Sequence, residues 1–155
     1  MKLEHTVHYQ APGPLGWLRL TLTESDAVTA AGFVDRPGKN QIVPTELATA
    51  LDVYFKNSTH LPKHLFQFPS AATDWQRAVW HTIAAVPQGK TITYTELAAG
   101  AGRPQAARSA GTTCGRNPLA LFIPCHRVVR KTGEDFGYSW GEARKRWLLE
   151  HEGAI

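Results

Sequence analysis

Two helix-start signatures in the second half of the chain constrain its fold most. Thr73 and Gln76 form a Thr-x-x-Gln pair, and Thr93 and Glu96 form a Thr-x-x-Glu pair twenty residues later. In such a capping box the threonine side chain accepts a hydrogen bond from the backbone three residues on, and the Gln or Glu side chain accepts one from the threonine N–H. Apolar residues at helical spacing follow each pair, so the sequence predicts a helix after each one.

The residues after Thr93 complete a helix-turn-helix pattern. Gly100 and Gly102 are expected to end the short helix that Thr93 starts, and Pro104 suits the first turn of a further helix that ends near Gly115. Short helices joined by a glycine-containing turn occur in DNA-binding domains and in ordinary cores. The pattern alone therefore leaves DNA binding and core packing open.

The first seventy residues have a different pattern. Residues 17–23 alternate, with Trp17 and Arg19 expected on one face and leucines on the other, and β-like runs flank them. An apolar stripe at helical spacing in residues 44–57 predicts a helix. We therefore predict an α/β fold class. Residues 1–72 form a small N-terminal α/β domain, an antiparallel sheet plus a helix, with a surface linker from residue 58. Residues 73–155 form a mainly helical C-terminal domain with the helix-turn-helix.

Composition bounds the class of protein. The chain has 155 residues and is 43% hydrophobic, as in an ordinary globular protein. No apolar run approaches the ~18–20 residues of a membrane span, and the N-terminus lacks the apolar stretch of a signal peptide. We therefore expect no membrane partner and a cytoplasmic protein, nucleoid-associated if bacterial and nuclear if eukaryotic.

Positive charge gathers in the last third of the chain. The net charge is +4. The basic residues of this part are Arg103, Arg108, Arg116, Arg127, Arg130, Lys131, Arg144, Lys145 and Arg146. Such a cluster suits a nucleic-acid partner, but it also suits a solubilising surface, and charge alone does not decide between them.

Cysteine and histidine usage excludes the common metal sites. Two cysteines, Cys114 and Cys125, are too few for a disulfide framework and form no Cys-x-x-Cys pair. His60 and His64 have the spacing of two ligands on one helix face, but Pro62 between them argues against a helix. We expect neither a metal nor a cofactor.

Cys125 has the neighbours of a candidate nucleophile. A free thiol has a pKa of about 8.5, so only a few per cent is thiolate near neutrality, and His126 is a nearby base. Adjacent side chains of an extended strand point apart, so the two side chains act together only if the chain turns there. Residues 119–125 are expected to be buried and extended. An inert cysteine beside a satisfied core histidine is an equal alternative, and Cys114 is interpreted first as a small hydrophobe.

Longer motifs supply a resemblance that covers residues 73–153. IPCHRVV around Cys125 resembles the active-site motif of the O6-alkylguanine-DNA alkyltransferases, also called methylated-DNA–protein-cysteine methyltransferases. DWQRAVWHTIAAVPQGKTITYTELA, RPQAARSAG, GRNP, GYSWG and KRWLLEHEG match the same family in order. The spacing agrees as well, since Asn117 lies eight residues before Cys125 and Tyr138 thirteen after it. The N-terminal seventy residues resemble the family only weakly.

The resemblance implies direct-reversal DNA repair. An alkyl group, typically methyl, would move from O6-alkylguanine to Cys125, irreversibly and once per molecule, and O4-alkylthymine is a second candidate substrate. His126 would act as base through a water, and Glu152 would orient its imidazole. Asn117 would hold Cys125 in place, and Tyr94 would help to rotate the nucleotide and to protonate the leaving guanine.

The resemblance also implies how DNA is held. The helix-turn-helix would dock in the minor groove of double-stranded DNA, and the protein would be a monomer. Arg108 would fill the space that the flipped nucleotide leaves, between small residues such as Ala107 and Gly111. The other residues implied at the base are Ser139, Val128, Tyr138, Trp140 and Lys145, the last as a support for the Cys125 carbonyl.

One departure and three rivals complete the sequence-based picture. Trp140 stands where many family members have glycine, so we expect methyl adducts to be repaired well and benzyl-sized adducts poorly. The rivals are an alkyltransferase-like protein that only binds the lesion, a helix-turn-helix regulator, and a Cys-His hydrolase. The first of these lacks the motif cysteine, which is present here as Cys125.

Overall fold

The chain divides into two compact units. The computed structural model describes residues 4–39, 42–57, 59–132 and 137–155. The sheet unit comprises Met1–Pro69 and Pro118–Phe122, and the helical unit comprises Ser70–Asn117 and Ile123–Ile155. The sequence predicted domains of residues 1–72 and 73–155, so two segments differ: residues 70–72 belong to the helical unit, and Pro118–Phe122 belongs to the sheet unit. The backbone explains the second difference, because Ala31 N donates to Pro118 O and Ala120 N donates to Ala31 O, both at 2.9 Å.

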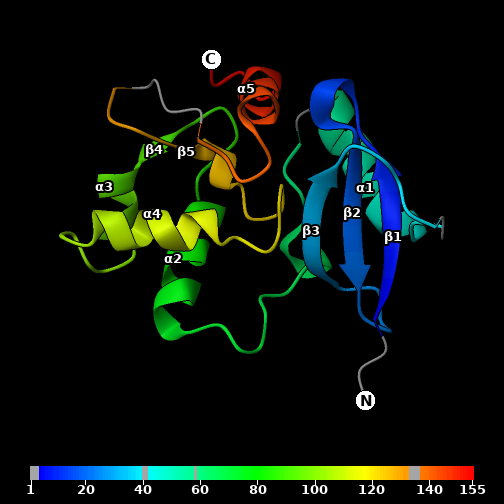
Figure 1. Ribbon diagram of the computed structural model, residues 1–155, viewed down its shortest axis with the longest axis horizontal. Coiled ribbons are helices and arrows are strands. Elements are labelled where there is room, and N and C mark those ends of the chain that lie inside the picture. Colours follow the sequence, from blue (N-terminus) through cyan, green and yellow to red (C-terminus); the bar gives the residue numbers. More distant parts are fainter. Residues whose placement is uncertain (1–3, 40–41, 58, 133–136) are drawn as a thin grey trace. The chain divides into compact units, whose positions relative to one another are not determined.

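The sheet unit is built on a three-stranded antiparallel sheet (Figure 1). Its strands β1 (His5–Gln10), β2 (Trp17–Leu22) and β3 (Val28–Val34) pair in sequence order, with a 3₁₀ turn η1 (Gly13–Leu15) before β2. Alternate residues of β2 are buried, and these are its three leucines, as the alternation predicted. The predicted α/β fold class is thus confirmed for this unit by a sheet with one covered face.

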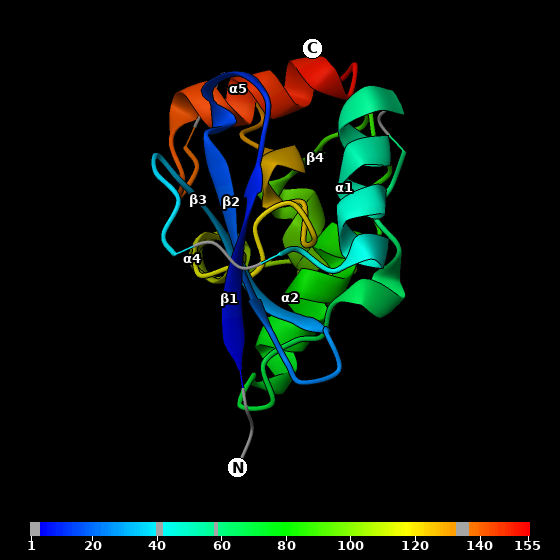
Figure 2. The ribbon, with the colours of Figure 1, turned by 90° about the vertical axis from the view of Figure 1, so that its right-hand side faces the viewer.

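Helix α1 (Thr45–Asn57) lies over one face of that sheet (Figure 2). Its buried side chains are Leu47, Leu51 and Tyr54, which belong to the stripe that the sequence showed. Tyr9 of β1 connects the sheet to helix α1. Its hydroxyl donates to Asp52 Oδ1 at 2.6 Å and its ring stacks on Phe55 with centroids 5.9 Å apart.

Two segments differ from the predicted surface linker and the predicted extended run. The predicted surface linker contains the 3₁₀ turn η2 (Lys63–Leu65) with a buried Leu65, and Gln67 N donates to Val28 O at 3.0 Å, so this segment joins the sheet unit. Residues 119–125 are buried, but the prediction that they are extended is wrong. Leu121 has φ +75°, in the left-handed region, and the chain turns back on itself there.

The helical unit starts with α2 (Asp74–Ala84) and the pair α3 (Tyr94–Gly100) and α4 (Ala107–Gly115). Both predicted capping boxes are confirmed, with Thr73 and Thr93 each exchanging two hydrogen bonds with the Gln or Glu three residues on. Helix α4 begins later than the expected Pro104, because Ala106 N donates to Arg103 O in a turn before the helix.

Contacts among these helices and two short strands position the unit's centre. Trp80 Nε1 of α2 donates to Thr113 O, and Trp75 Nε1 donates to Ser109 Oγ, so α4 packs on α2. Strand β4 (Ile92–Thr93) pairs in parallel with β5 (Val128–Val129), which follows the 3₁₀ turn η3 (Cys125–Arg127). This pairing fixes the start of α3 next to the turn that carries Cys125. Helix α5 (Glu142–His151) completes the unit. Among the described residues, no helix is both long enough and apolar enough to span a bilayer.

Candidate active site

The chain turns at Cys125, as it must if the adjacent side chains of Cys125 and His126 are to act together. Cys125 N donates to Ile123 O at 2.7 Å, Arg127 N donates to Pro124 O at 2.9 Å, and Val128 N donates to Cys125 O. The turn gives the side chains of Cys125 and His126 different contact partners. Cys125 Sγ lies against Asn117, whereas the His126 imidazole lies against Glu152.

Hydrogen-bond donors surround the Cys125 sulfur. Asn117 Nδ2 lies 3.0 Å from Cys125 Sγ and 2.8 Å from Ile123 O, so one amide group links the sulfur to the turn before it. A hydrogen bond from the Cys114 side chain lowers the pKa of the Cys125 thiol below its ordinary value. Burial opposes that effect, while the Asn117 bond and the positive charge of Lys145 add to it. The site therefore raises the fraction of thiolate, the nucleophilic form of cysteine, above that of a free thiol.

A buried cluster of three charged or titratable side chains follows Cys125. Glu152 Oε2 lies 3.0 Å from His126 Nε2, and Arg127 donates to both carboxylate oxygens of Glu152 at 2.8 Å. Arg127 Nη1 also donates to Val86 O at 2.7 Å. Burial by itself raises the pKa of Glu152, but the bonds from Arg127 and His126 outweigh it and hold that pKa well below its ordinary range.

The protonation of His126 follows from this cluster. An ionised Glu152 only accepts hydrogen bonds, so His126 Nε2 carries the proton that it donates. Burial lowers the pKa of His126 against the raising effect of Glu152, so the ring is neutral near pH 7. Nδ1 is then an acceptor, and it is buried with no hydrogen-bond partner among the residues that the structure describes. A neutral imidazole with an unoccupied acceptor nitrogen can take up a proton.

A cavity of about 250 Å³ opens onto the sulfur of Cys125. Its lining comes from α3, from α4 and from the segment before α5. The lining residues are Tyr94, Gly111, Cys114, Gly115, Cys125, Arg130, Gly137, Tyr138 and Ser139. The cysteine thus lines a space that a small group can enter, although only 5% of its own surface is exposed.

Most of the residues singled out in the sequence lie in or behind this cavity. Ser139 Oγ, expected at the guanine edge, donates to Gly115 O at 2.8 Å. Lys145 is fully buried, and the bonds of its ammonium include Val128 O at 2.8 Å and Gly137 O at 3.1 Å. Trp140 is outside the cavity lining and packs edge-on against Tyr138, with ring centroids 5.2 Å apart.

A shallower hollow of about 530 Å³ lies beside the first, over α3 and α4. Tyr94, Gly111 and Arg130 line both spaces. The exposed Arg108 and its neighbour Ala107 line only the shallow one. The helix pair therefore presents a hollowed surface, with a cationic side chain, that adjoins the cavity of Cys125.

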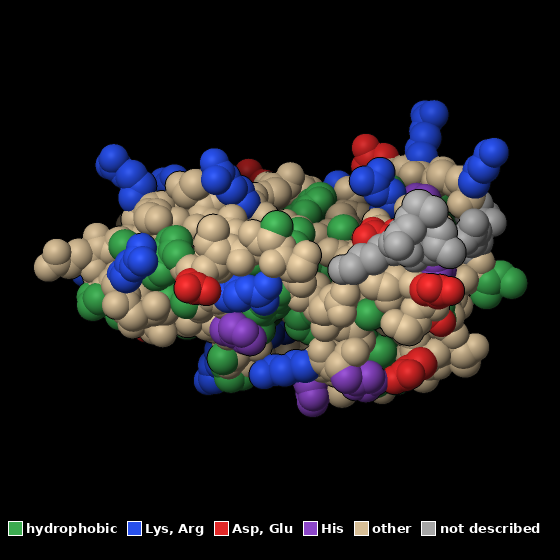
Figure 3. Space-filling model, turned by 90° about the horizontal axis from the view of Figure 1, so that it is seen from below, with side chains coloured by type: hydrophobic (Ala, Val, Ile, Leu, Met, Phe, Trp, Pro, Cys, Tyr) green, Lys and Arg blue, Asp and Glu red, His purple; other side chains and the backbone are tan. Residues whose placement is uncertain are grey.

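Two contacts at the site had no signal in the sequence. Arg127 was counted with the basic cluster, which left a nucleic-acid surface and a solubilising surface open, but it is buried and bound to Glu152. Lys145 of the same basic group is also buried, and on the face shown in Figure 3 the exposed Lys and Arg side chains project at separate places. Cys114 is buried, in line with its interpretation as a small hydrophobe, and it also lines the cavity of Cys125. Spacing along the chain does not reveal the contact of Arg127 with Glu152 or the place of Cys114 at the cavity.

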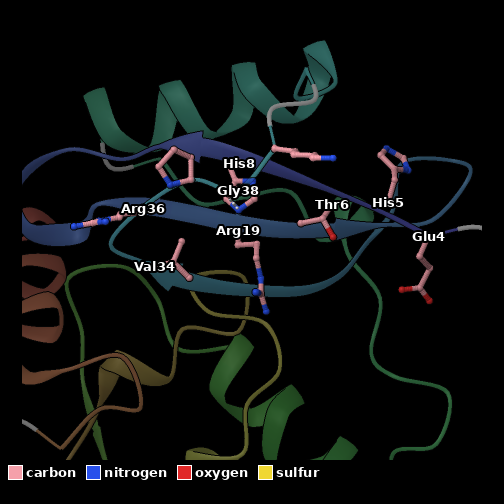
Figure 4. A pocket seen from close by; sticks show the side chains of 10 residues that line it. Glu4, His5, Thr6, His8, Arg19, Val34, Arg36 and Gly38 are labelled. Atoms are coloured by element: carbon pink, nitrogen blue, oxygen red, sulfur yellow. Dashed lines mark hydrogen bonds between the residues drawn. The ribbon is translucent and has the colours of Figure 1, made fainter.

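Another hollow belongs to the sheet unit (Figure 4). It has a volume of about 600 Å³, and its lining includes Arg19, Arg36 and His8, whose Nε2 accepts a hydrogen bond from Gly38 N at 3.1 Å. Its lining contains no cysteine, so it is not the place of thiol chemistry. Among the described residues, no three His, Cys, Asp or Glu side chains gather as a metal site requires.

The fold and the site define a class of protein: one with a helix-turn-helix and an activated cysteine in an adjoining cavity. Residues 74–154 match the family described as 6-O-methylguanine DNA methyltransferase, DNA binding domain. The chain belongs to this family, which confirms the resemblance seen in its motifs.

Individual relatives agree with that assignment. The methylated-DNA–protein-cysteine methyltransferase of Salmonella typhimurium is 41% identical over 112 residues, 72% of this chain and 65% of that protein. The match thus spans slightly less than two thirds of the relative's length. The crystal structure of Mycobacterium tuberculosis O6-methylguanine methyltransferase has a TM-score of 0.84 at 29% identity and covers 98% of this chain and 94% of its own. A structure of Mycobacterium tuberculosis OGT in complex with DNA has a TM-score of 0.79 at 30% identity and covers 97% and 92%.

Proposed function

We propose that this protein repairs double-stranded DNA by direct reversal, transferring an alkyl group from O6-alkylguanine to Cys125. One observation carries the proposal above all. The Cys125 sulfur accepts a hydrogen bond from Asn117 and lines a cavity, and a buried His-Glu-Arg cluster lies directly behind its turn. Membership of the methyltransferase family supports the same reaction.

The chemistry balances with the residues of this chain alone. The Cys125 sulfur attacks the alkyl carbon, an S–C bond forms, and the bond between that carbon and O6 breaks. The electron pair stays on O6, and the proton of the thiol ends on the guanine. The products are a thioether and an unmodified guanine. Removing the alkyl group again would require the Cys125 thiolate to leave from carbon, and a thiolate is a poor leaving group there, so each molecule acts once, and no cofactor takes part.

Roles in this proposal follow the geometry of the site. His126 Nδ1 accepts the thiol proton through a water, since this nitrogen is the free acceptor of the ring. Glu152 stabilises the imidazolium that results, and Arg127 keeps Glu152 ionised. Asn117 holds the sulfur in position, and Lys145 fixes the backbone at Val128.

The base must leave the duplex before the sulfur can reach it. Extruding a nucleotide costs a few kcal/mol, which contacts in the protein must offset. In our proposal α4 enters the minor groove, where the small residues Ala107 and Gly111 allow close approach and Arg108 fills the vacated place in the stack. Tyr94, at the junction of both hollows, turns the nucleotide and helps to protonate it.

The flipped base is held by the segment that precedes α5. Ser139, Tyr138 and the backbone of Val128 contact the guanine, and Trp140 restricts adduct size indirectly, through the ring of Tyr138 that it supports. We propose that the protein works as a monomer and that it acts on DNA inside the cell. The Mycobacterium tuberculosis structure with DNA supports a DNA partner.

Intact mass spectrometry tests the function. The protein is incubated with an excess of duplex containing O6-methylguanine, with Cys125→Ser as the matched control. We expect a gain of one methylene that stops at one equivalent and maps to the peptide carrying Cys125, and no gain in the control. Binding of the duplex without any mass gain would instead favour a lesion-binding protein or a regulator, and repeated turnover would favour a hydrolase.

A further inference from the structure

The two cysteines of the chain share one cavity. Cys114 lies in the last turn of α4 and Cys125 in the first position of η3, and both line the space of about 250 Å³ described above. Both are free thiols, with 6% and 5% of their surfaces exposed. The cavity therefore holds a second sulfur beside the sulfur that takes the alkyl group.

The reacting sulfur needs donors, and the histidine next to it does not supply one. His126 Nε2 bonds to Glu152, so the ring's hydrogen bond points away from Cys125. A buried anion without hydrogen bonds is costly, because the interior solvates charge poorly. Asn117 gives one donor at 3.0 Å, and the side chain of Cys114 is hydrogen-bonded to Cys125 as well. A thiol S–H donates and a thiolate accepts, so the direction of that bond is set once Cys125 ionises.

We propose that Cys114 is a second working thiol of the acceptor site, whose S–H donates to the Cys125 sulfur and holds it as the anion that attacks the alkyl carbon. This inference rests on the proposed function and assigns a role to a side chain that would otherwise contribute only packing. Alkylation removes the charge and leaves a thioether sulfur, which accepts hydrogen bonds only weakly, so Cys114 stabilises the reactive thiolate more than the alkylated product.

The role has a kinetic signature that packing does not have. Removing a donor raises the pKa of the thiol, so the thiolate fraction falls tenfold for each unit wherever the pH lies below that pKa. The intrinsic nucleophilicity of a thiolate rises as its pKa rises, with a Brønsted coefficient of about 0.4–0.5. Without Cys114, alkyl transfer is therefore slower on the low-pH side of the titration but faster on the high-pH side, and the two profiles of rate against pH cross.

Other groups near the sulfur also titrate or carry charge. Those that line the cavity or act on Cys125 from the neighbouring elements are Tyr94, Arg130, Tyr138 and Lys145, and His126 follows Cys125 in the chain. All of them are present in every protein compared, so they shape all the profiles alike. The difference between the profiles isolates Cys114.

The experiment measures single-turnover methyl transfer from an O6-methylguanine duplex at saturation, across pH, for the natural protein, Cys114→Ala and Cys114→Ser. For each unit by which the midpoint rises in Cys114→Ala, we expect transfer about threefold slower below the midpoint of the natural protein and about threefold faster on the high-pH plateau. Cys114→Ser keeps a hydroxyl donor, so its midpoint stays near that of the natural protein. Coincident profiles overturn the proposal, and so does a rate lowered by the same factor at every pH, which marks structural damage only.

A second readout separates this inference from the function on which it rests. The ultraviolet absorbance of the thiolate is titrated in the same proteins, with Cys125→Ser as the blank that reports Cys114 alone. We expect the Cys125 titration to move upward in Cys114→Ala whether or not methyl is transferred. If no protein accepts methyl and the titration still moves, the repair function fails and the hydrogen bond stands. If methyl is accepted and the titration does not move, only the role of Cys114 fails.

Discussion

At the scale of single residues, the cluster behind Cys125 shows how a buried carboxylate stays charged. Glu152 receives two hydrogen bonds from Arg127 and one from His126, and all three side chains are almost fully buried. A buried charge is tolerated only when it is paired and hydrogen-bonded. The charge of Glu152 in turn fixes which nitrogen of His126 carries its proton. The proposed base and the stability of the fold therefore depend on the same contacts.

Removal of the guanidinium gives the first prediction. Arg127→Gln leaves Glu152 without its bidentate partner, and breaking a buried pair in this way costs about 3–5 kcal/mol of folding free energy. Urea unfolding measures the loss. Arg116→Gln is the matched control, since Arg116 is exposed and should cost little. A double variant, Arg127→Gln with Glu152→Gln, should recover part of the loss because no unpaired charge remains. An Arg127→Gln protein as stable as the control would contradict the pairing.

The pH dependence of stability gives the second prediction. The folded-state pKa values of His126 and Glu152 are both below their ordinary values. Groups shifted in this direction bind more protons in the unfolded state, so they stabilise the fold above the unfolded pKa and lose that effect as the pH falls. Stability should therefore decline below about pH 6.5 through His126, and further below about pH 4.3 through Glu152.

Unfolding free energies measured across that window check the prediction. In His126→Gln the first decline should shrink while the second remains. His8 also has a lowered pKa, caused by burial and by the charge of Arg19, so His8→Gln serves as the control for a histidine outside the site. A first decline that is unchanged in His126→Gln would show that this histidine is not the group responsible.

At the scale of elements, short helices with strong start signals position the site. The first residue of α3 is Tyr94, which lines the cavity of Cys125, and the capping box at Thr93 fixes where that helix begins. Strand β4, which contains Thr93, pairs with β5 immediately after the Cys125 turn. A local signal in the sequence, the capping box, thus determines where Tyr94 lies along the cavity.

Loss of that cap gives the third prediction. Thr93→Ala removes the side-chain acceptor of the Glu96 N–H and should cost about 1 kcal/mol of stability, within a range of about 0.5–2 kcal/mol. Thr93→Ser should restore most of it, and Thr91→Ala, at an exposed position outside the helix, should have little effect. Thermal unfolding of the three proteins measures the differences. Equal losses in Thr93→Ala and Thr91→Ala would argue against the capping role.

At the scale of the whole molecule, the exposed positive charges determine how the protein can bind the proposed DNA partner. The chain has a net charge of +4, and part of its basic group is internal, since Arg127 and Lys145 are buried. The cations that remain for a polyanion are the exposed ones, of which Arg108 lies on α4 beside the cavity. Binding to DNA should therefore depend on salt through a small number of phosphate or groove contacts.

Removal of Arg108 gives the fourth prediction. Arg108→Ala should bind undamaged duplex more weakly, with the slope of log affinity against log salt reduced by about one if the side chain neutralises one phosphate. If it instead fills the stack, methyl transfer should fall more on duplex than on single-stranded DNA, because only the duplex must be held open. Fluorescence anisotropy and single-turnover transfer measure the two effects. Arg103→Ala is the control, as Arg103 lies over the Trp75 ring. An Arg108→Ala protein that matches the control in both assays would exclude the assigned role.

Several features of the fold followed from the sequence alone. Both capping boxes, the alternating strand β2 and the apolar stripe of α1 were predicted, because each depends on residues within one turn or one strand of each other. The family was also predicted, from motifs spread over residues 73–153. The assignment of Cys125 as nucleophile and of His126 as its base stays a prediction.

Only the tertiary structure decided the contacts between residues far apart in the chain. It placed Arg127 on Glu152, Cys114 beside Cys125, and Pro118–Phe122 along β3. The physical reason is that burial, and the pKa shifts that burial causes, depend on what surrounds a group in three dimensions. The presence of an arginine in the sequence does not reveal whether its charge is exposed to water, bound to DNA or paired with a carboxylate. The presence of a cysteine does not reveal whether its sulfur contacts another sulfur.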